Sequence, residues 1–407
     1  MQENRIEIPK KSKFIIEFVI YLLFALGPLT GNVILVLFGV LSTEFSVSIS
    51  AVQIAIPAFM FPFAITQLFS GAISDIKGRF QVILFGLIIF GIGMTIAAIS
   101  FSLTMYIIAN ILGGIGFGFV NPVLIALLTD ISFGPNIPKK MGYLGAVANL
   151  GVGFGPILAG QLVNVGWSYL YLTFILITVF GFVILLILRK IPLKSDQKAT
   201  MRLFFKQVSE EIRRKVVILM ILSAFLIAQT YLAILTWTSR AFTGEISESL
   251  AGIVVGSAGI TGAIAGVIIG NVIKIKGVKA AIITGLISLY LSILVLLVVE
   301  DVTNIELLLF TTIGLILTGA AGGIFIPSMM YYSQTLSKER RGALAGLVTA
   351  GQFTGIAFVP IIFDWFFENG GIQMVYFVVL IISFLLVLVI ITLYYVARSV
   401  DYSKLKV

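Results

Sequence analysis

Long apolar runs separated by short polar segments fill this sequence from end to end. A helix needs about 20 apolar residues to cross a bilayer, where every backbone polar group must be hydrogen-bonded within the helix. Twelve such runs begin near Phe14, Ala51, Phe80, Leu103, Met141, Leu170, Val216, Ala251, Ala280, Ile305, Ala343 and Val375. The pattern predicts an all-α integral membrane protein with twelve transmembrane helices.

Composition excludes several other classes of protein. The chain is 59% hydrophobic and only 11% charged, whereas a soluble domain carries about 25% charged residues. Its net charge of +9 is spread over short loops, so we expect no nucleic-acid partner. Because the chain has no Cys, no His and no nucleotide-binding loop motif, we expect no enzyme activity, no metal site and no cofactor.

The longest polar stretch divides the apolar runs six and six. It covers residues 189–215, carries nine basic residues, and includes four apolar residues spaced for an interfacial amphipathic helix. These four are Leu203, Phe204, Val208 and Ile212. The division predicts an N-terminal six-helix bundle in 1–188, a cytoplasmic linker in 189–215 and a C-terminal six-helix bundle in 216–407.

The basic residues predict the orientation in the membrane. If the N-terminus lies in the cytoplasm, only Arg240 of the 27 Lys and Arg residues falls on the outer side. Cytoplasmic loops carry this excess of basic residues, and the bias sets topology. We expect a multi-pass protein of the plasma membrane with both termini in the cytoplasm.

The segment GAISDIKGRFQV, which follows the second run, carries a specific motif. Gly71 suits a close approach between helices, and Gly78 suits a turn with positive φ. With Asp75 and Arg79 they resemble the G-x-x-x-D-x-x-G-R loop between helices 2 and 3 of the major facilitator superfamily. The resemblance implies two pseudo-symmetric six-helix bundles around a central cavity.

A second copy of the pattern lies in the other half of the chain. The loop recurs in degraded form at Gly270, Lys274 and Gly277, and Gly118 and Pro122 match Gly323 and Pro327. The internal repetition favours the same two-bundle architecture.

The family resemblance implies a conformational latch at the cytoplasmic side. Asp75 would meet the N-terminus of helix 11, where the helix dipole favours an anion, and Arg79 would pair with Asp130 at the end of helix 4. Gly71 and Gly78 complete the latch, which would close this side in the outward-open state. The alternative is that these are solvated loop charges that only set topology.

The fifth run has the spacing Gly142, Gly151, Gly155-Pro156 and Gly160. This resembles the G-x8-G-x3-G-P-x2-G-G signature of the antiporter branches of the superfamily, with Ala159 in place of one glycine. Proline bends a helix, and glycines allow close packing. We interpret the run as a gate helix; the alternative is ordinary small-residue packing.

The segment FPFAITQLFSGAISDIKGRF resembles helix 2 of bicyclomycin- and chloramphenicol-type drug:proton antiporters. That family has an acid where this chain has Asn32 and an arginine where it has Asn110. Both charges are missing together, and two neutral amides can satisfy each other. Proton coupling would then need a peripheral carboxylate, with Glu17 the first candidate and Asp364 the second.

The positions of the polar residues within the runs suggest further roles. Glu17 is more simply explained as snorkelling to the cytoplasmic interface, and Arg240, Asp364 and Glu368 as outer-rim residues. A buried amide is as often a helix–helix hydrogen bond as a ligand contact. The candidate lining of a substrate cavity comprises Asn32, Asn110, Asn121, Asn149, Gln229, Tyr231, Tyr331 and Gln352.

The sequence thus predicts a secondary active transporter that exports small organic compounds, drugs or metabolites, by alternating access. One alternative is an uptake carrier or uncoupled facilitator for an organic metabolite. A second is a non-transporting sensor on the same fold. The expected partners of this monomer are a small organic substrate, the lipid bilayer and, if a carboxylate titrates during transport, protons.

Overall fold

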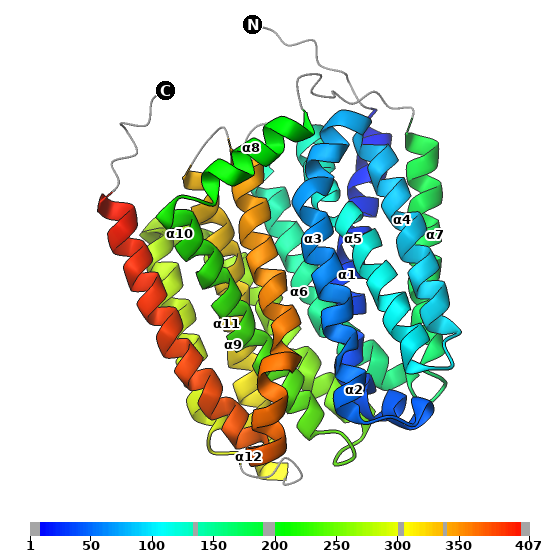
Figure 1. Cartoon of the computed structure of the whole chain (residues 1–407), viewed down its shortest axis with the longest axis vertical. Helices are drawn as coiled ribbons and strands as arrows, with labels where there is room; N and C mark the ends of the chain where they lie inside the picture. Colours follow the sequence, from blue (N-terminus) through cyan, green and yellow to red (C-terminus); the bar gives the residue numbers. More distant parts are fainter. Residues whose placement is uncertain (1–8, 133–136, 190–199, 300–304, 337–339, 400–407) are drawn as a thin grey trace, which may run out of the picture.

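A computed structural model describes residues 9–132, 137–189, 200–299, 305–336 and 340–399 as a bundle of long helices (Figure 1). The two termini and part of the predicted linker lie outside the described residues. In chain order the helices are α1 Lys10–Phe45, α2 Ile49–Gln53, α3 Ala55–Lys77, α4 Arg79–Ala98, α5 Leu103–Ile131, α6 Ile137–Leu162, α7 Ser168–Leu188, α8 Met201–Glu211, α9 Lys215–Ala241, α10 Glu248–Leu296, α11 Ile305–Thr335 and α12 Arg341–Ser399.

The described helices provide twelve membrane-crossing segments. Ten spans are long and apolar enough to cross a bilayer, with α2 and α3 together forming one of them. Two of the ten, α10 and α12, leave the helical conformation at Gly277 (φ 81°) and Gly371 (φ 63°). The chain folds back at each glycine, as the two limbs of α12 show in Figure 1. Each of these helices therefore supplies two crossings, as the apolar runs predict.

Hydroxyl side chains from the polar segments start several of the helices. The Ser48, Ser102 and Ser247 hydroxyls accept hydrogen bonds from backbone N–H groups in the first turns of α2, α5 and α10. Such a cap satisfies one of the N–H groups that a helix start leaves without an internal partner. The polar loops thus fix where these helices begin, and the apolar runs fix how far they extend.

The helices pack in two groups. One consists of α1 and α3–α7, the other of α9–α12, and they meet where α6 lies along α10 and α3 along α12. We call the end that holds α8, Arg79 and Lys276 the basic end, and the end that holds Arg240 and Gly371 the far end (Figure 1). The limits at 188 and 216 stay a prediction.

Helix α8 crosses the basic end and contacts both groups, through α3 and α12. Its last residue, Glu211, is buried and lies 2.6 Å from Arg214 and 3.1 Å from Arg340, which precedes α12. Arg340 also lies 2.8 Å from Glu210. A buried carboxylate with two guanidinium partners ties this helix firmly to the second group.

The turn at Gly371 provides a test of the fold. Its φ of 63° and ψ of −162° belong to a region that is essentially restricted to glycine, so Gly371→Ala should destabilise the protein by about 1–3 kcal/mol. The measurement is the thermal unfolding midpoint of purified protein in detergent. Gly142→Ala is the control, because Gly142 is helical and exposed and alanine there should leave the midpoint unchanged or raise it. Equal midpoints for the two variants would contradict the fold-back at Gly371.

Candidate functional site

Arg79, the first residue of α4, joins the predicted latch residues into one cluster. Its Nε donates to Asp130 Oδ2 at the end of α5 over 2.9 Å, and its Nη1 pairs with Asp75 and donates to Ser74 Oγ over 2.5 Å. Gly78, between α3 and α4, has a φ of 99°, which confirms the expected turn. The role as a latch, including the contact of Asp75 with the start of α12, stays a prediction.

Gly71 does not lie at a close approach between helices in this conformation, so that expectation is wrong here. A methyl group on Gly71 would meet none of the described atoms within 4 Å. Its carbonyl oxygen instead accepts a hydrogen bond of 2.7 Å from the Ser74 hydroxyl. Ser74 in turn accepts from Arg79, so Gly71 supports the cluster through its backbone.

The glycines of the predicted gate helix, α6, face two different neighbours. On the α1 side, methyl groups on Gly151 and Gly155 would lie 2.8 Å and 2.7 Å from carbonyl oxygens of that helix. On the α10 side, a methyl group on Gly160 would lie 2.2 Å from the Glu248 carbonyl oxygen, and Pro156 packs closely against Gly252. The glycines and the proline of the gate motif therefore let α6 pack closely against both α1 of its own group and α10 of the other group.

Gly142 is the exception among these glycines. A methyl group there would meet none of the described atoms within 4 Å, and Gly145 and Gly270 share this property. All three lie toward the basic end, whereas the close contacts lie in the far half. The close contacts that the glycines make between α6 and α10 therefore lie in the far halves of these helices.

The tightest contact between the groups involves glycines that the sequence motif does not include. Methyl groups on Gly153 and Gly259 would lie 2.8 Å from the Gly256 carbonyl oxygen and 2.0 Å from the Gly153 nitrogen, respectively. The signal in the sequence is the run of small residues at Gly252, Gly256 and Gly259, a spacing that lets helix backbones approach in a membrane.

Hydrogen bonds join the two groups in the far half. The Ser239 hydroxyl of α9 donates to the Leu35 carbonyl of α1, and Gln161 Nε2 of α6 donates to Ser249 Oγ of α10 over 2.6 Å. Arg240 Nη2 donates to Ser50 Oγ of α2 over 3.3 Å. These bonds close the far end of the molecule.

Arg240 lies at the end of α9 at the far end, and the outer-rim position expected for it stays a prediction. Its side chain is only 9% exposed and lies 2.6 Å from Glu368. The guanidinium also lies 5.8 Å from the ring centre of Trp237 and 5.2 Å from that of Phe367. Stacking and ion pairing hold the one basic residue of the far end at the boundary between the groups.

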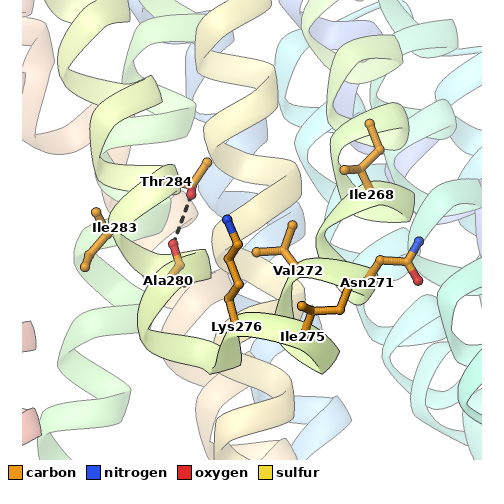
Figure 2. Close-up of a pocket in the computed structure, with 8 residues that line it drawn as sticks. All are labelled: Ile268, Asn271, Val272, Ile275, Lys276, Ala280, Ile283 and Thr284. Atoms are coloured by element: carbon orange, nitrogen blue, oxygen red, sulfur yellow. Dashed lines mark hydrogen bonds between the residues drawn. The ribbon is translucent and has the colours of Figure 1, made fainter.

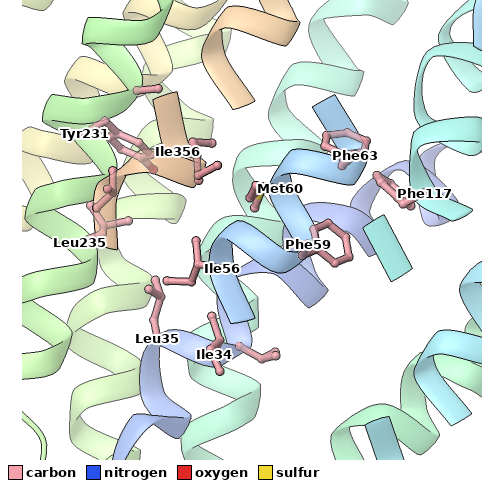
Figure 3. Close-up of a cluster of buried hydrophobic side chains, with 14 of the residues drawn as sticks. Ile34, Leu35, Ile56, Phe59, Met60, Phe63, Phe117, Tyr231, Leu235 and Ile356 are labelled. Carbon is pink, nitrogen blue, oxygen red and sulfur yellow. The ribbon is translucent and has the colours of Figure 1, made fainter. Parts of the chain in front are cut away.

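Below these polar contacts, apolar side chains fill the space between the groups (Figure 3). The rings of Phe63 and Phe353 lie 4.4 Å apart, and those of Phe61 and Phe358 lie 5.3 Å apart. We call the buried side chains of this boundary the apolar plug: Ile34, Leu35, Ile56, Phe59, Met60, Phe63, Tyr231, Leu235 and Ile356. The plug closes the far half by direct packing.

The two amides at the expected charged positions do not satisfy each other. Asn32 Nδ2 donates to the Pro28 carbonyl over 2.7 Å, and Asn110 Nδ2 donates to the Tyr106 carbonyl over 2.8 Å. Each bond stays within one helix, and no described hydrogen bond joins the two side chains. The expectation of a mutual pair is wrong because each amide finds a backbone acceptor one turn away.

The other candidate cavity residues have different environments. Gln229 is 1% exposed and donates to the Gly355 carbonyl of α12 over 2.6 Å, so it links two helices of one group. Tyr231 belongs to the apolar plug. Asn149 donates within α6 over 3.0 Å and lies against α10. Tyr331 is 51% exposed, and two of the set are half-buried, namely Asn121 and Gln352.

The two candidate coupling carboxylates differ in how their charge is balanced. Glu17 forms an ion pair with Lys140 in the first turn of α6, and its expected snorkelling to the cytoplasmic interface stays a prediction. Asp364 lies one turn before Glu368, and its Oδ1 is buried with no hydrogen-bond partner in the described part of the chain. Asp364 as a residue is half-buried, so it is recessed rather than fully exposed at the rim.

Membrane-spanning hairpins in two groups, which meet where α6 lies along α10 and α3 along α12, define a multi-pass membrane protein. The family model of the Major Facilitator Superfamily matches residues 18–244 and 239–406. The chain therefore belongs to this superfamily, whose members handle small organic substrates in the membrane and are not enzymes. This confirms the predicted twelve-helix fold class.

Relatives agree with the family assignment. The chain is 25% identical to the quinolone resistance protein NorA of Staphylococcus aureus strain COL over 362 residues, which cover 87% of this chain and 90% of that protein. It is 28% identical to multidrug resistance protein D of Escherichia coli K12 over 154 residues, which cover 37% of this chain and 38% of that protein.

The glycine contact between α6 and α10 yields a prediction. Gly153→Val should force the helices apart and open the far end, whereas Gly145→Val should not, because Gly145 faces open space. The readout is thiol labelling of a cysteine placed at Leu35, a buried plug residue, in a chain that has no other cysteine. Labelling should rise several-fold in Gly153→Val alone. Equal labelling in both variants would show that Gly153 does not hold the far end closed.

Proposed function

We propose that the chain is a secondary active transporter that exports small, amphipathic or moderately polar organic compounds by alternating access. The observation that carries the proposal is the asymmetry between the two ends of the boundary between the groups. Hydrogen bonds and the apolar plug close the far half, whereas toward the basic end the glycines of α6 and α10 make no close contact and the groups meet through Leu68 of α3 and through α8. With the basic end in the cytoplasm, this conformation would admit a substrate from inside the cell.

The nature of the boundary supports the choice of substrate class. Side chains of the plug are apolar or aromatic, and such surfaces bind apolar and aromatic molecules with few polar contacts. Asn32 and Asn110 are neutral where related antiporters carry charges, so nothing at these positions offsets the desolvation of a cation. The names of the two relatives, which refer to quinolone and multidrug resistance, support drug-like substrates for this chain.

The environments of the carboxylates change the order of the coupling candidates. Glu17 already has a cationic partner in Lys140. Asp364 has a buried, unpartnered oxygen and lies one turn from Glu368 of the Arg240–Glu368 pair. Opening of the far end would expose this carboxylate to water, which the closed conformation keeps from one of its oxygens. Asp364 is therefore the first candidate for coupling and Glu17 the second.

Flux in proteoliposomes with an imposed pH gradient tests export and coupling together. The substrates are a fluoroquinolone, the cation ethidium and the neutral chloramphenicol. We expect gradient-driven transport of the fluoroquinolone or chloramphenicol by the wild type, and at least a ten-fold loss in Asp364→Asn. Glu17→Gln should retain most of the flux. The exposed carboxylate of Glu245 at the far end provides the matched control, Glu245→Gln.

Three outcomes of this assay would contradict the proposal. Gradient-driven flux that survives Asp364→Asn would remove this residue as the coupling site. Substrate movement only down its own gradient, unaffected by pH, would favour the uncoupled facilitator. If none of the three compounds moves in the wild type, export of drug-like compounds is wrong, and the sensor alternative gains support.

The orientation has an independent test. A reporter that works only in the cytoplasm should be active when it is fused after Val407. A reporter that works only outside the cell should be active when it is inserted beside Gly244, because basic residues gather at the opposite end from Gly244. Activity of each fusion is measured in intact cells. An external C-terminus would reverse the orientation and, with it, the direction of transport.

A further inference from the structure

A cavity lies between the two limbs of α10, next to the fold-back at Gly277 (Figure 2). Its volume is about 470 Å³, within the range of sites that hold small organic molecules. All of its lining residues belong to α10: Ile268, Asn271, Val272, Ile275, Lys276, Ala280, Ile283 and Thr284. Because it lies within one hairpin and not between the two groups, the cavity is separate from the proposed transport path.

The walls of the cavity are aliphatic and open to the surroundings of the protein. Ile268, Ile275 and Ile283 are 56%, 78% and 47% exposed. Ile268 and Thr284 lie nine and seven residues from Gly277, which places them about 13 Å and 11 Å into the membrane at the helical rise. An exposed aliphatic wall at this depth faces the part of the acyl chains nearest the headgroups. Contact between aliphatic side chains and lipid costs no free energy there.

The floor of the cavity carries a positive charge. The Lys276 side chain rises from the turn, and its ammonium group lies between the two limbs (Figure 2). No ion pair to Lys276 or to its neighbour Lys274 occurs within the described residues. The Thr284 hydroxyl already donates to the Ala280 carbonyl over 2.9 Å. A ligand in this cavity therefore meets one cation, aliphatic walls and the amide of Asn271, and an anion with an apolar tail matches this lining.

A second lysine strengthens the field at the mouth of the cavity. Lys279, two residues after Gly277, holds its ammonium 5.0 Å from the ring centre of Tyr394 on α12. Cation–π contact keeps this charge beside the turn. Lys274, Lys276 and Lys279 thus give one turn three positive charges at the level where lipid headgroups lie.

We propose that this cavity binds an anionic phospholipid of the leaflet at the basic end. Its phosphate contacts Lys276, and one acyl chain lies along Ile268, Ile275 and Ile283. Basic pockets between transmembrane helices are suited to such headgroups. The aliphatic walls favour a lipid over free phosphate, because they offer an inorganic anion no further hydrogen-bond donor and exclude the water that would solvate it.

The test compares two lysines of the same turn. Full-length protein in detergent is titrated with phosphatidylglycerol or phosphatidylcholine, and bound lipid is counted by native mass spectrometry. We expect the wild type to prefer phosphatidylglycerol and Lys276→Gln to bind it about five-fold more weakly, the effect of one basic residue worth about 1 kcal/mol. Lys274→Gln loses the same charge outside the cavity and should keep most of the binding.

A second variant separates the cavity from the charge. Thr284→Phe fills the space between the limbs without changing any charge and should also lower phosphatidylglycerol binding. Thermal unfolding in phosphatidylcholine checks that each variant is folded. An equal loss in Lys276→Gln and Lys274→Gln would show attraction to the surface alone and overturn the site. Retained binding in Thr284→Phe, or displacement of the lipid by millimolar inorganic phosphate, would overturn it as well.

Discussion

Contact between helix backbones is the interaction on which this structure depends. In lipid, burying one apolar side chain against another gains little, because the acyl chains are just as apolar. Helices therefore hold together where small residues let their backbones meet. Gly86 against Gly116 and Gly93 against Gly113 bring α4 and α5 together within one group, whereas Gly153 meets α10 of the other group. The same device serves a permanent contact and the boundary that must open for transport.

Several charges inside the described helices are held in ion pairs. Arg79 bridges two aspartates, Glu17 pairs with Lys140, and Arg240 pairs with Glu368 between two aromatic rings. An unpaired charge costs free energy in a membrane, so each of these charged side chains needs a partner of opposite charge. Asp364 departs from the rule, because one of its oxygens is buried without a hydrogen-bond partner.

The features that could be predicted from the sequence are those that depend on residues close together along the chain. Twelve apolar runs are local features, and Gly78 imposes a turn through its own backbone, so both appear in the structure as expected. The Glu17–Lys140 pair joins residues 123 positions apart, and no local pattern contains it. The division of the α6 glycines between α1 and α10 also depends on which helices become neighbours. Asn32 and Asn110 do not pair across helices, because each donates to a backbone carbonyl one turn earlier in its own helix.

The contact of Gly153 with Gly259 divides the first limb of α10 unequally. Gly259 lies eleven residues from the start of α10 and eighteen from Gly277, or about 16 Å and 27 Å at the helical rise. If this contact acts as a fulcrum, a tilt of the hairpin moves the basic end about 1.6 times as far as the far end. A small separation at the far end would then accompany a larger closing movement at the basic end. The ratio between the two movements is therefore set by the position of Gly259 in the hairpin.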